Sequence, residues 1–186
     1  MRIAVLLSLL LLGSCGSGPK TNFFTLEPIG RGQETMRRMP AATRIEVGDV
    51  TLPATLDRQA LVTHADGGRL NVSDQDRWAA PLTDLTRRAL TEDLRERIAA
   101  ESVLAPGDPQ PGGGVATIMI NVQQFSAGPD RQVILDVDWS VMRNRKSGQT
   151  FRDVIRVPVA DDNAAAVVQA MSRALAQLAD RLAASV

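Results

Sequence analysis

Apolar residues recur along this chain with two different periods, and the period predicts the type of element. A period of two, which is typical of a half-buried strand, covers 44–52 and is stopped by a proline. Two more short strands, 60–64 and 69–72, flank the turn sequence 65–68, which ends in two glycines. Glycine adopts the positive φ of tight turns, so these strands are expected to pair as a hairpin. Residues 22–26 are apolar enough to dock as one further strand.

Alternation returns in the second half of the chain and predicts a three-stranded meander. Apolar and polar positions alternate over 117–122 and 133–142, and a third strand is expected over 151–159. The connections between these strands are rich in glycine, proline and polar residues, which favour turns. The segment 101–114 contains three prolines and three consecutive glycines and is therefore expected to be a loop.

An amphipathic helix is predicted between the two groups of strands. It is expected from Asp76 to about Ala100, with Asp74 or Asp76 as its cap and Pro81 in its first turn. Its apolar positions are Trp78, Leu82, Leu85, Ala89, Leu90, Leu94 and Ile98. Because the last three positions are spaced by four, the apolar stripe drifts around the axis. Either the helix curves over a twisted sheet, or Leu90, Leu94 and Ile98 form a seam against another subunit.

A second helix is predicted at the end of the chain, and it completes the fold class. Asp161 or Asp162 is expected to cap it, and Val168, Met171 and three later leucines repeat at three-four spacing. The order of strands, helix, strands and helix predicts an α+β fold. We expect a mixed or antiparallel sheet of about five to six strands, with two long helices packed on one face.

Composition excludes several classes of function. A length of 186 residues suits one globular domain with extensions. Basic and acidic residues number 21 each, so the chain has no broad positive surface for nucleic acid. Aromatic residues make up only 3% of the chain and tyrosine is absent, which argues against stacking platforms for bases or sugars.

The first residues have the pattern of a bacterial lipoprotein signal. Arg2 precedes an apolar run from Ile3 to Leu12, which is too short to span a bilayer. Small residues follow, and the segment 12–15 resembles a lipobox with Cys15 as the lipidated amino terminus. The alternative is an ordinary secretory peptide that contains a cysteine. Two or more acyl chains anchor a protein stably, and a lipoprotein cysteine carries three.

The lipobox also predicts how the chain is divided and sorted. We expect a signal peptide over 1–14, a lipidated terminus and tether over 15–42, and a globular domain over 43–186. The residue after Cys15 is Gly16 rather than the aspartate that commonly retains lipoproteins in the inner membrane. The expected location is therefore the periplasmic face of the outer membrane.

Candidate catalytic groups are few. His64 is the only histidine, and no nucleophile elbow, zinc-binding helix motif or paired cysteine motif occurs in the sequence. Asp136 and Asp138 lie on one face of an expected strand, where they could hold a metal or act as an acid–base pair. Their alternation with apolar residues favours a solvated outer face instead. We therefore expect no metal, no cofactor except a covalent lipid on Cys15, and no enzymatic activity.

Two strings carry a resemblance to a known family. They are Leu52-Pro53-Ala54-Thr55-Leu56-Asp57-Arg58 with the residues up to Thr63, and Asp76-Arg77-Trp78-Ala79-Ala80-Pro81-Leu82. Together with Cys15 and the segment 23–26, they resemble the PqiC/YmbA family of auxiliary lipoproteins of ABC-type and MCE-type envelope transport systems. The resemblance implies structural or docking roles, without catalysis, for Leu52, Pro53, Asp57, Arg58, Asp76, Arg77, Trp78 and Pro81.

The resemblance also implies partners. It predicts an outer-membrane lipoprotein that works as a homo-oligomer beside a tunnel-forming MCE-domain protein and an integral inner-membrane component, and that supports membrane integrity. An alternative is a periplasmic carrier that holds a phospholipid or acyl chain in its own cavity, between sheet and helices. An envelope hydrolase is a third possibility, for which the sequence has no recognisable catalytic constellation.

Overall fold

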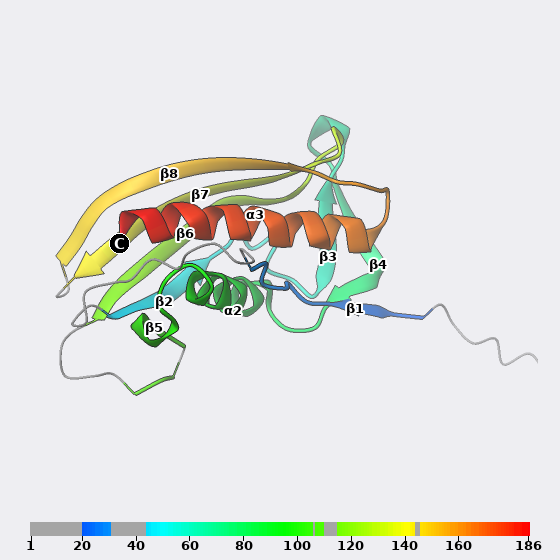
Figure 1. The fold of residues 1–186 in the computed structure, drawn as a ribbon. Coiled ribbons are helices and arrows are strands. Elements are labelled where there is room, and N and C mark those ends of the chain that lie inside the picture. Colours follow the sequence, from blue (N-terminus) through cyan, green and yellow to red (C-terminus); the bar gives the residue numbers. More distant parts are fainter. Residues whose placement is uncertain (1–19, 31–43, 106, 110–114, 144–145) are drawn as a thin grey trace, which may run out of the picture.

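The main sheet has five strands in the order β5-β2-β6-β7-β8 (Figure 1). It is seen in a computed structural model that describes residues 20–30, 44–105, 107–109, 115–143 and 146–186. β2 pairs in parallel with both β5 and β6, whereas β6, β7 and β8 form the predicted antiparallel meander. The sheet is therefore mixed. Its strands are β2 (Arg44–Thr51), β5 (Val103–Leu104), β6 (Val115–Ala127), β7 (Gln132–Arg143) and β8 (Lys146–Pro158).

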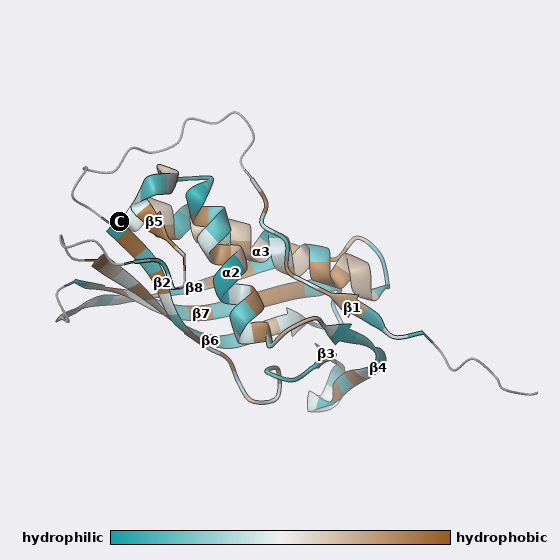
Figure 2. Cartoon of the chain, turned by 90° about the horizontal axis from the view of Figure 1, so that it is seen from below, coloured by the Kyte–Doolittle hydropathy of each residue, from teal (hydrophilic) through white to brown (hydrophobic). Residues whose placement is uncertain are grey.

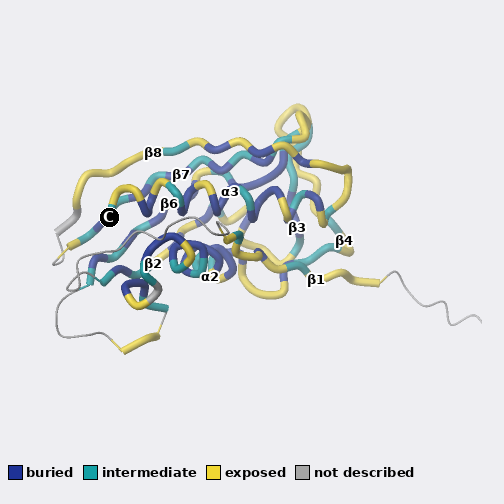
Figure 3. The backbone as a smooth tube through the Cα atoms, in the orientation of Figure 1, coloured by how far each residue is buried: buried dark blue, intermediate teal, exposed yellow. Residues whose placement is uncertain are grey.

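Helices α2 (Leu82–Arg95) and α3 (Ala164–Ser185) lie side by side on one face of the main sheet (Figures 1 and 2). The alternation in β7 explains this placement, because every second residue from Val133 to Val141 is buried against the helices. Figure 3 shows buried residues recurring along both helices and along β6 and β7. The predicted α+β class, with both helices on one face, is confirmed.

A second, smaller sheet closes one end of the domain. Its order is β1-β4-β3, formed by β1 (Asn22–Phe24), β4 (Leu70–Trp78) and β3 (Ala60–His64). The predicted hairpin of β3 and β4 is present, and the glycines of its turn have φ of 69° and 75°. Both views place this sheet where the described chain begins, at the end opposite the C-terminus (Figures 1 and 2).

The predicted start of the first helix is wrong. Asp76 to Trp78 belong to the end of β4, which β1 extends in parallel on one side. The helix begins at Leu82, after Pro81 in extended conformation as its N-cap. A proline disfavours helical geometry in the residue before it, so the helix cannot begin upstream. Neither Asp74 nor Asp76 is therefore a cap, and α2 is 14 residues long.

The other boundary differences are smaller. The second helix is capped by Asn163, whose side chain accepts a hydrogen bond from the Ala166 N–H at 2.8 Å, and not by Asp161 or Asp162. The expected loop 101–114 contains the short strand β5, and β8 begins before residue 151. The leader, Cys15 and most of the expected tether lie outside the described residues. None of the helices among the described residues is long and apolar enough to cross a membrane.

The predicted subunit seam is also wrong. Leu90, Leu94 and Ile98 are fully buried within the single chain. They pack into the core that α2 shares with α3 and β2. Ile98 lies beyond the end of α2, so the drift of the apolar stripe came in part from a residue outside the helix, and these buried side chains offer no surface to another subunit.

Candidate functional site

The two sequence strings that carry the family resemblance meet where β3 begins and β4 ends. Asp57, Arg58 and Gln59 line a pocket of about 440 Å³ together with Trp78 and the segment 79–81. The Trp78 N–H donates to the Gln59 carbonyl at 2.7 Å, and Arg77 Nη1 donates to the Gln59 side chain at 3.2 Å. Residues about twenty positions apart in the sequence thus form one surface, which we call the motif pocket.

Within the motif pocket, the roles of the residues divide by exposure. Trp78 is 2% exposed and forms its floor, whereas Asp57, Arg58 and Pro81 are exposed at its rim. Trp78 therefore holds the shape of the pocket, and Asp57 and Arg58 are the charged groups that a partner can reach.

The remaining motif residues are structural. Leu52 is buried, and the Pro53 carbonyl accepts hydrogen bonds from the N–H groups of Leu56 and Asp57, which turns the chain before β3. Asp76 accepts hydrogen bonds from the Asn22 amide and from the Ser73 hydroxyl, both at 2.9 Å. Asp76 thereby fastens β1 to β4. Leu52, Pro53 and Asp76 do not line the motif pocket.

A second cluster fastens the N-terminal segment across both helices. The Glu27 N–H donates to the Ser172 hydroxyl of α3 at 3.1 Å, and the Ile29 N–H donates to Asp93 Oδ1 of α2 at 2.7 Å. Arg97 completes the cluster, because it donates to the Ile29 carbonyl, to Asp93 and to Asp180 of α3. Residues 24–30, here called the strap, are thus tied to the helices.

The strap cluster is electrostatically unusual because it is buried. The side chains of Asp93 and Arg97 are 0% and 3% exposed, and Asp180 is 35% exposed. Burial raises the pKa of Asp93 from 3.8 to about 6, although the Ile29 N–H and the Arg97 charge lower it. Asp93 Oδ2 is buried without a hydrogen-bond partner in the part of the chain that the structure describes. Such a carboxylate depends on Arg97 to remain charged.

Sequence reasoning missed this cluster. Ala89, Asp93 and Arg97 are spaced by four, so two opposite charges share one face of the predicted helix with an alanine, although α2 itself ends at Arg95. A charged pair on an apolar face was the available signal. The partners of this pair, on the strap and on α3, are distant in sequence, so the sequence carried no signal for them.

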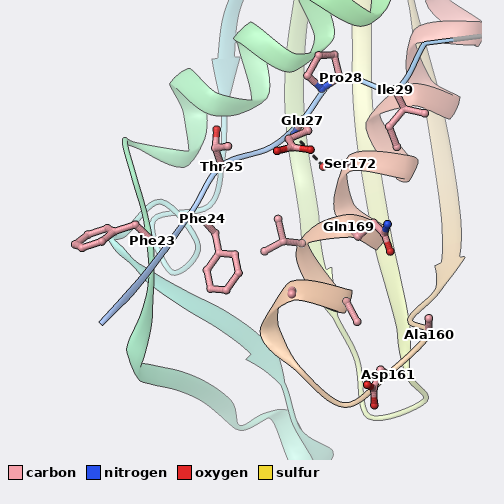
Figure 4. A pocket seen from close by; sticks show the side chains of 13 residues that line it. Phe23, Phe24, Thr25, Glu27, Pro28, Ile29, Ala160, Asp161, Gln169 and Ser172 are labelled. Atoms are coloured by element: carbon pink, nitrogen blue, oxygen red, sulfur yellow. Dashed lines mark hydrogen bonds between the residues drawn. The ribbon is translucent and has the colours of Figure 1, made fainter. Parts of the chain in front are cut away.

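A groove lies between the strap and the first half of α3. Figure 4 shows Phe24 pointing toward α3 and Phe23 pointing away from it. The groove has a volume of about 630 Å³, and its charged lining groups are Glu27 and Asp161. Its walls combine the apolar side chains of the strap with small side chains of the helix, and its shape depends on the contacts that fix the strap.

The candidate catalytic residues do not assemble into a reactive site. His64 Nδ1 lies 2.7 Å from the Ser126 hydroxyl, but Ser126 is fully buried and out of reach of a substrate. Asp136 is paired with Arg152 at 2.7 Å, and Asp138 accepts from Gln123 at 3.1 Å. Among the residues that the structure describes, no three histidine, cysteine or acidic side chains are placed to hold a metal ion.

Comparison with known proteins finds a matching family. A family described as "ABC-type transport auxiliary lipoprotein component" matches residues 24–183. None of the curated proteins is similar enough in sequence to match.

Two solved structures share the fold. One, of an uncharacterized protein, has 16% identity and a TM-score of 0.71, covering 90% of this chain and 99% of that one. The other is from Xanthomonas campestris, with 17% identity and a TM-score of 0.65, covering 88% of this chain and 93% of that one. At these identities, both comparisons establish the fold alone.

Proposed function

The chain belongs to the family of ABC-type transport auxiliary lipoprotein components, and on this premise we propose that it is an anchored, non-enzymatic adaptor of an envelope lipid-transport system. Cys15 carries the lipid anchor, residues 1–14 are removed, and the domain faces the periplasm from the outer membrane. The adaptor works beside a tunnel-forming MCE-domain protein and an integral inner-membrane component.

One observation carries this proposal beyond the family. The two motif strings converge on a pocket whose rim presents Asp57 and Arg58, and whose floor is the buried Trp78. A rigid aromatic floor with exposed charges at its rim is typical of a protein-docking site. Among the residues that the structure describes, neither histidine nor cysteine lines this pocket. It therefore supports docking better than catalysis.

The carrier alternative would place an acyl chain between the sheet and the helices. Core side chains from both sides meet in that layer, where Leu90, Ile118 and Leu175 are fully buried, and the groove of about 630 Å³ lies outside it, between the strap and α3. Close packing of this kind leaves little room for a chain of many methylenes. The adaptor is therefore the function that the geometry favours.

Reversing the charge of Arg58 should weaken docking without unfolding the domain. The side chain is exposed at the rim of the motif pocket, so Arg58→Glu is expected to leave stability within about 0.5 kcal/mol of wild type. Loss of a charged contact at an interface lowers affinity by about 2 kcal/mol, or roughly thirtyfold. The measurement is co-purification of the MCE-domain protein with the full-length lipoprotein from envelope extracts.

The matched control for this experiment is Arg156→Glu. Arg156 is also exposed, but it lies on β8 and outside the motif pocket. Capture of the MCE-domain protein should survive this change. Equal capture by the Arg58 variant and wild type, or equal loss in both variants, would contradict docking at the motif pocket.

A further inference from the structure

Apolar side chains are exposed on the small sheet at the end of the domain. Phe23 of β1 is 63% exposed, and Val72 and Leu70 of β4 are 43% and 37% exposed. Single exposed apolar residues are common on soluble domains. Here, however, three of the five large exposed apolar side chains among the described residues belong to one three-stranded sheet. Phe23 is among the residues that line the groove, but its ring points away from α3 (Figure 4).

The length of chain before this sheet limits its distance from the membrane. Cys15 and Asn22, the first residue of β1, are seven positions apart. Seven residues span at most about 25 Å when fully extended. If Cys15 carries the anchor, β1 therefore lies within about that distance of the lipid surface.

Contacts on both sides of β1 hold the beginning of the described chain against the domain. The Asn22 side-chain amide donates a hydrogen bond to Asp76, and the Ala79 N–H donates to the Phe24 carbonyl at 2.8 Å. The strap that follows is held by Ser172 and by the buried Asp93. These contacts fix the direction in which the tether leaves the domain, so they also fix which end of the domain is nearest to the anchor.

These observations single out one end of the molecule. We propose that the small sheet β1-β4-β3 rests on the leaflet that holds Cys15, with Phe23 buried among its lipids. The inference builds on the proposed lipidation of Cys15. Apolar burial at the headgroup boundary stabilises such contacts. Lys20, exposed and two residues before β1, adds a cation close to the lipid phosphates.

This orientation has a consequence for the adaptor. In this orientation, the end of the domain that holds the C-terminus, opposite the small sheet, points away from the leaflet (Figure 1). The motif pocket lies beside the small sheet, because Gln59 comes directly before β3 and Trp78 is the last residue of β4. A partner that docks there meets the adaptor close to the membrane surface.

The proposal is tested by fluorescence quenching on the full mature chain. Phe23→Cys, Val72→Cys and Val154→Cys are made separately and labelled with an environment-sensitive dye, because Cys15 is the only native cysteine and its thiol is blocked by acylation. The protein is placed in vesicles of phosphatidylethanolamine and phosphatidylglycerol that contain a lipid with a nitroxide near its headgroup. Val154 is the matched control, because it is apolar and 38% exposed but lies on β8 of the main sheet.

We expect quenching at positions 23 and 72 to be severalfold greater than at position 154. Equal quenching at all three positions would overturn the fixed orientation, and quenching at position 23 alone would overturn the role of the sheet. Co-sedimentation with the vesicles separates the two proposals. Protein that sediments but shows no quenching at position 23 keeps its anchor and contradicts only the orientation, whereas protein that fails to sediment contradicts the anchor itself.

Discussion

Replacing Arg97 with methionine is expected to lower the free energy of unfolding by about 3–5 kcal/mol. Methionine retains much of the length of the side chain but leaves Asp93, which is fully buried, without its cation. It also removes the hydrogen bonds to the Ile29 carbonyl and to Asp180. Urea unfolding of the domain at pH 7.5 measures the loss as a lower midpoint with an unchanged slope.

The matched variant is Asp93→Asn, which keeps an oxygen for the Ile29 N–H but carries no charge. Because the pKa of Asp93 rises from 3.8 to about 6 on folding, the folded state binds the proton more tightly than the unfolded state. The resulting stabilisation is complete below about pH 4 and is lost as the pH rises through 6. Relative to wild type, Asp93→Asn should therefore gain about 2–3 kcal/mol between pH 4 and pH 7.5.

The double variant shows whether the two side chains act as a pair. If they do, Arg97→Met should cost clearly less in the Asp93→Asn background, since no buried charge remains uncompensated. Two results together would show that the buried ion pair does not hold the strap. One is additive losses in the free energy of unfolding in the double variant, and the other is a free energy of unfolding that changes with pH in parallel for wild type and Asp93→Asn.

Replacing Cys15 with alanine should remove the protein from the outer-membrane fraction. The thiol is the proposed site of acylation, and several acyl chains together anchor a protein stably, at about 0.8 kcal/mol per buried methylene. Without the thiol the lipid cannot be attached. Fractionation of the envelope followed by immunoblotting measures the outcome.

Ser17→Ala serves as the control for the cysteine replacement. It makes a similarly small change two residues after Cys15 and leaves the thiol in place. This variant should fractionate with the outer membrane as the wild type does. Recovery of Cys15→Ala in the outer membrane at wild-type levels would refute the anchoring proposal.

The sequence predicted those parts of the fold that depend on local patterns. Alternation identified β6 and β7, and paired glycines identified the hairpin of β3 and β4. Parallel pairing of β2 with β6 left no local signal, because the paired residues lie about seventy positions apart. The segment 76–78 was assigned to a helix because Trp78 fitted the apolar stripe of α2, but strand pairing on both sides of β4 decides its structure.

The candidate site was predictable in part. The motif strings marked Asp57, Arg58 and Trp78, and the structure brings them together. It also separates the residues that shape the turn, such as Pro53, from those that face solvent. The strap cluster of Asp93, Arg97 and Asp180 was not predicted, because a buried ion pair is recognised only once the packing around it is known.

The proposed function depends on a covalent lipid on Cys15 that holds a docking domain at a membrane. The intact mass of the mature protein, purified from membranes, tests it most directly. We expect a chain that begins at Cys15 and carries the added mass of the acyl chains. A mature product with an unmodified sulfur, or one that still carries its leader, would refute lipid anchoring.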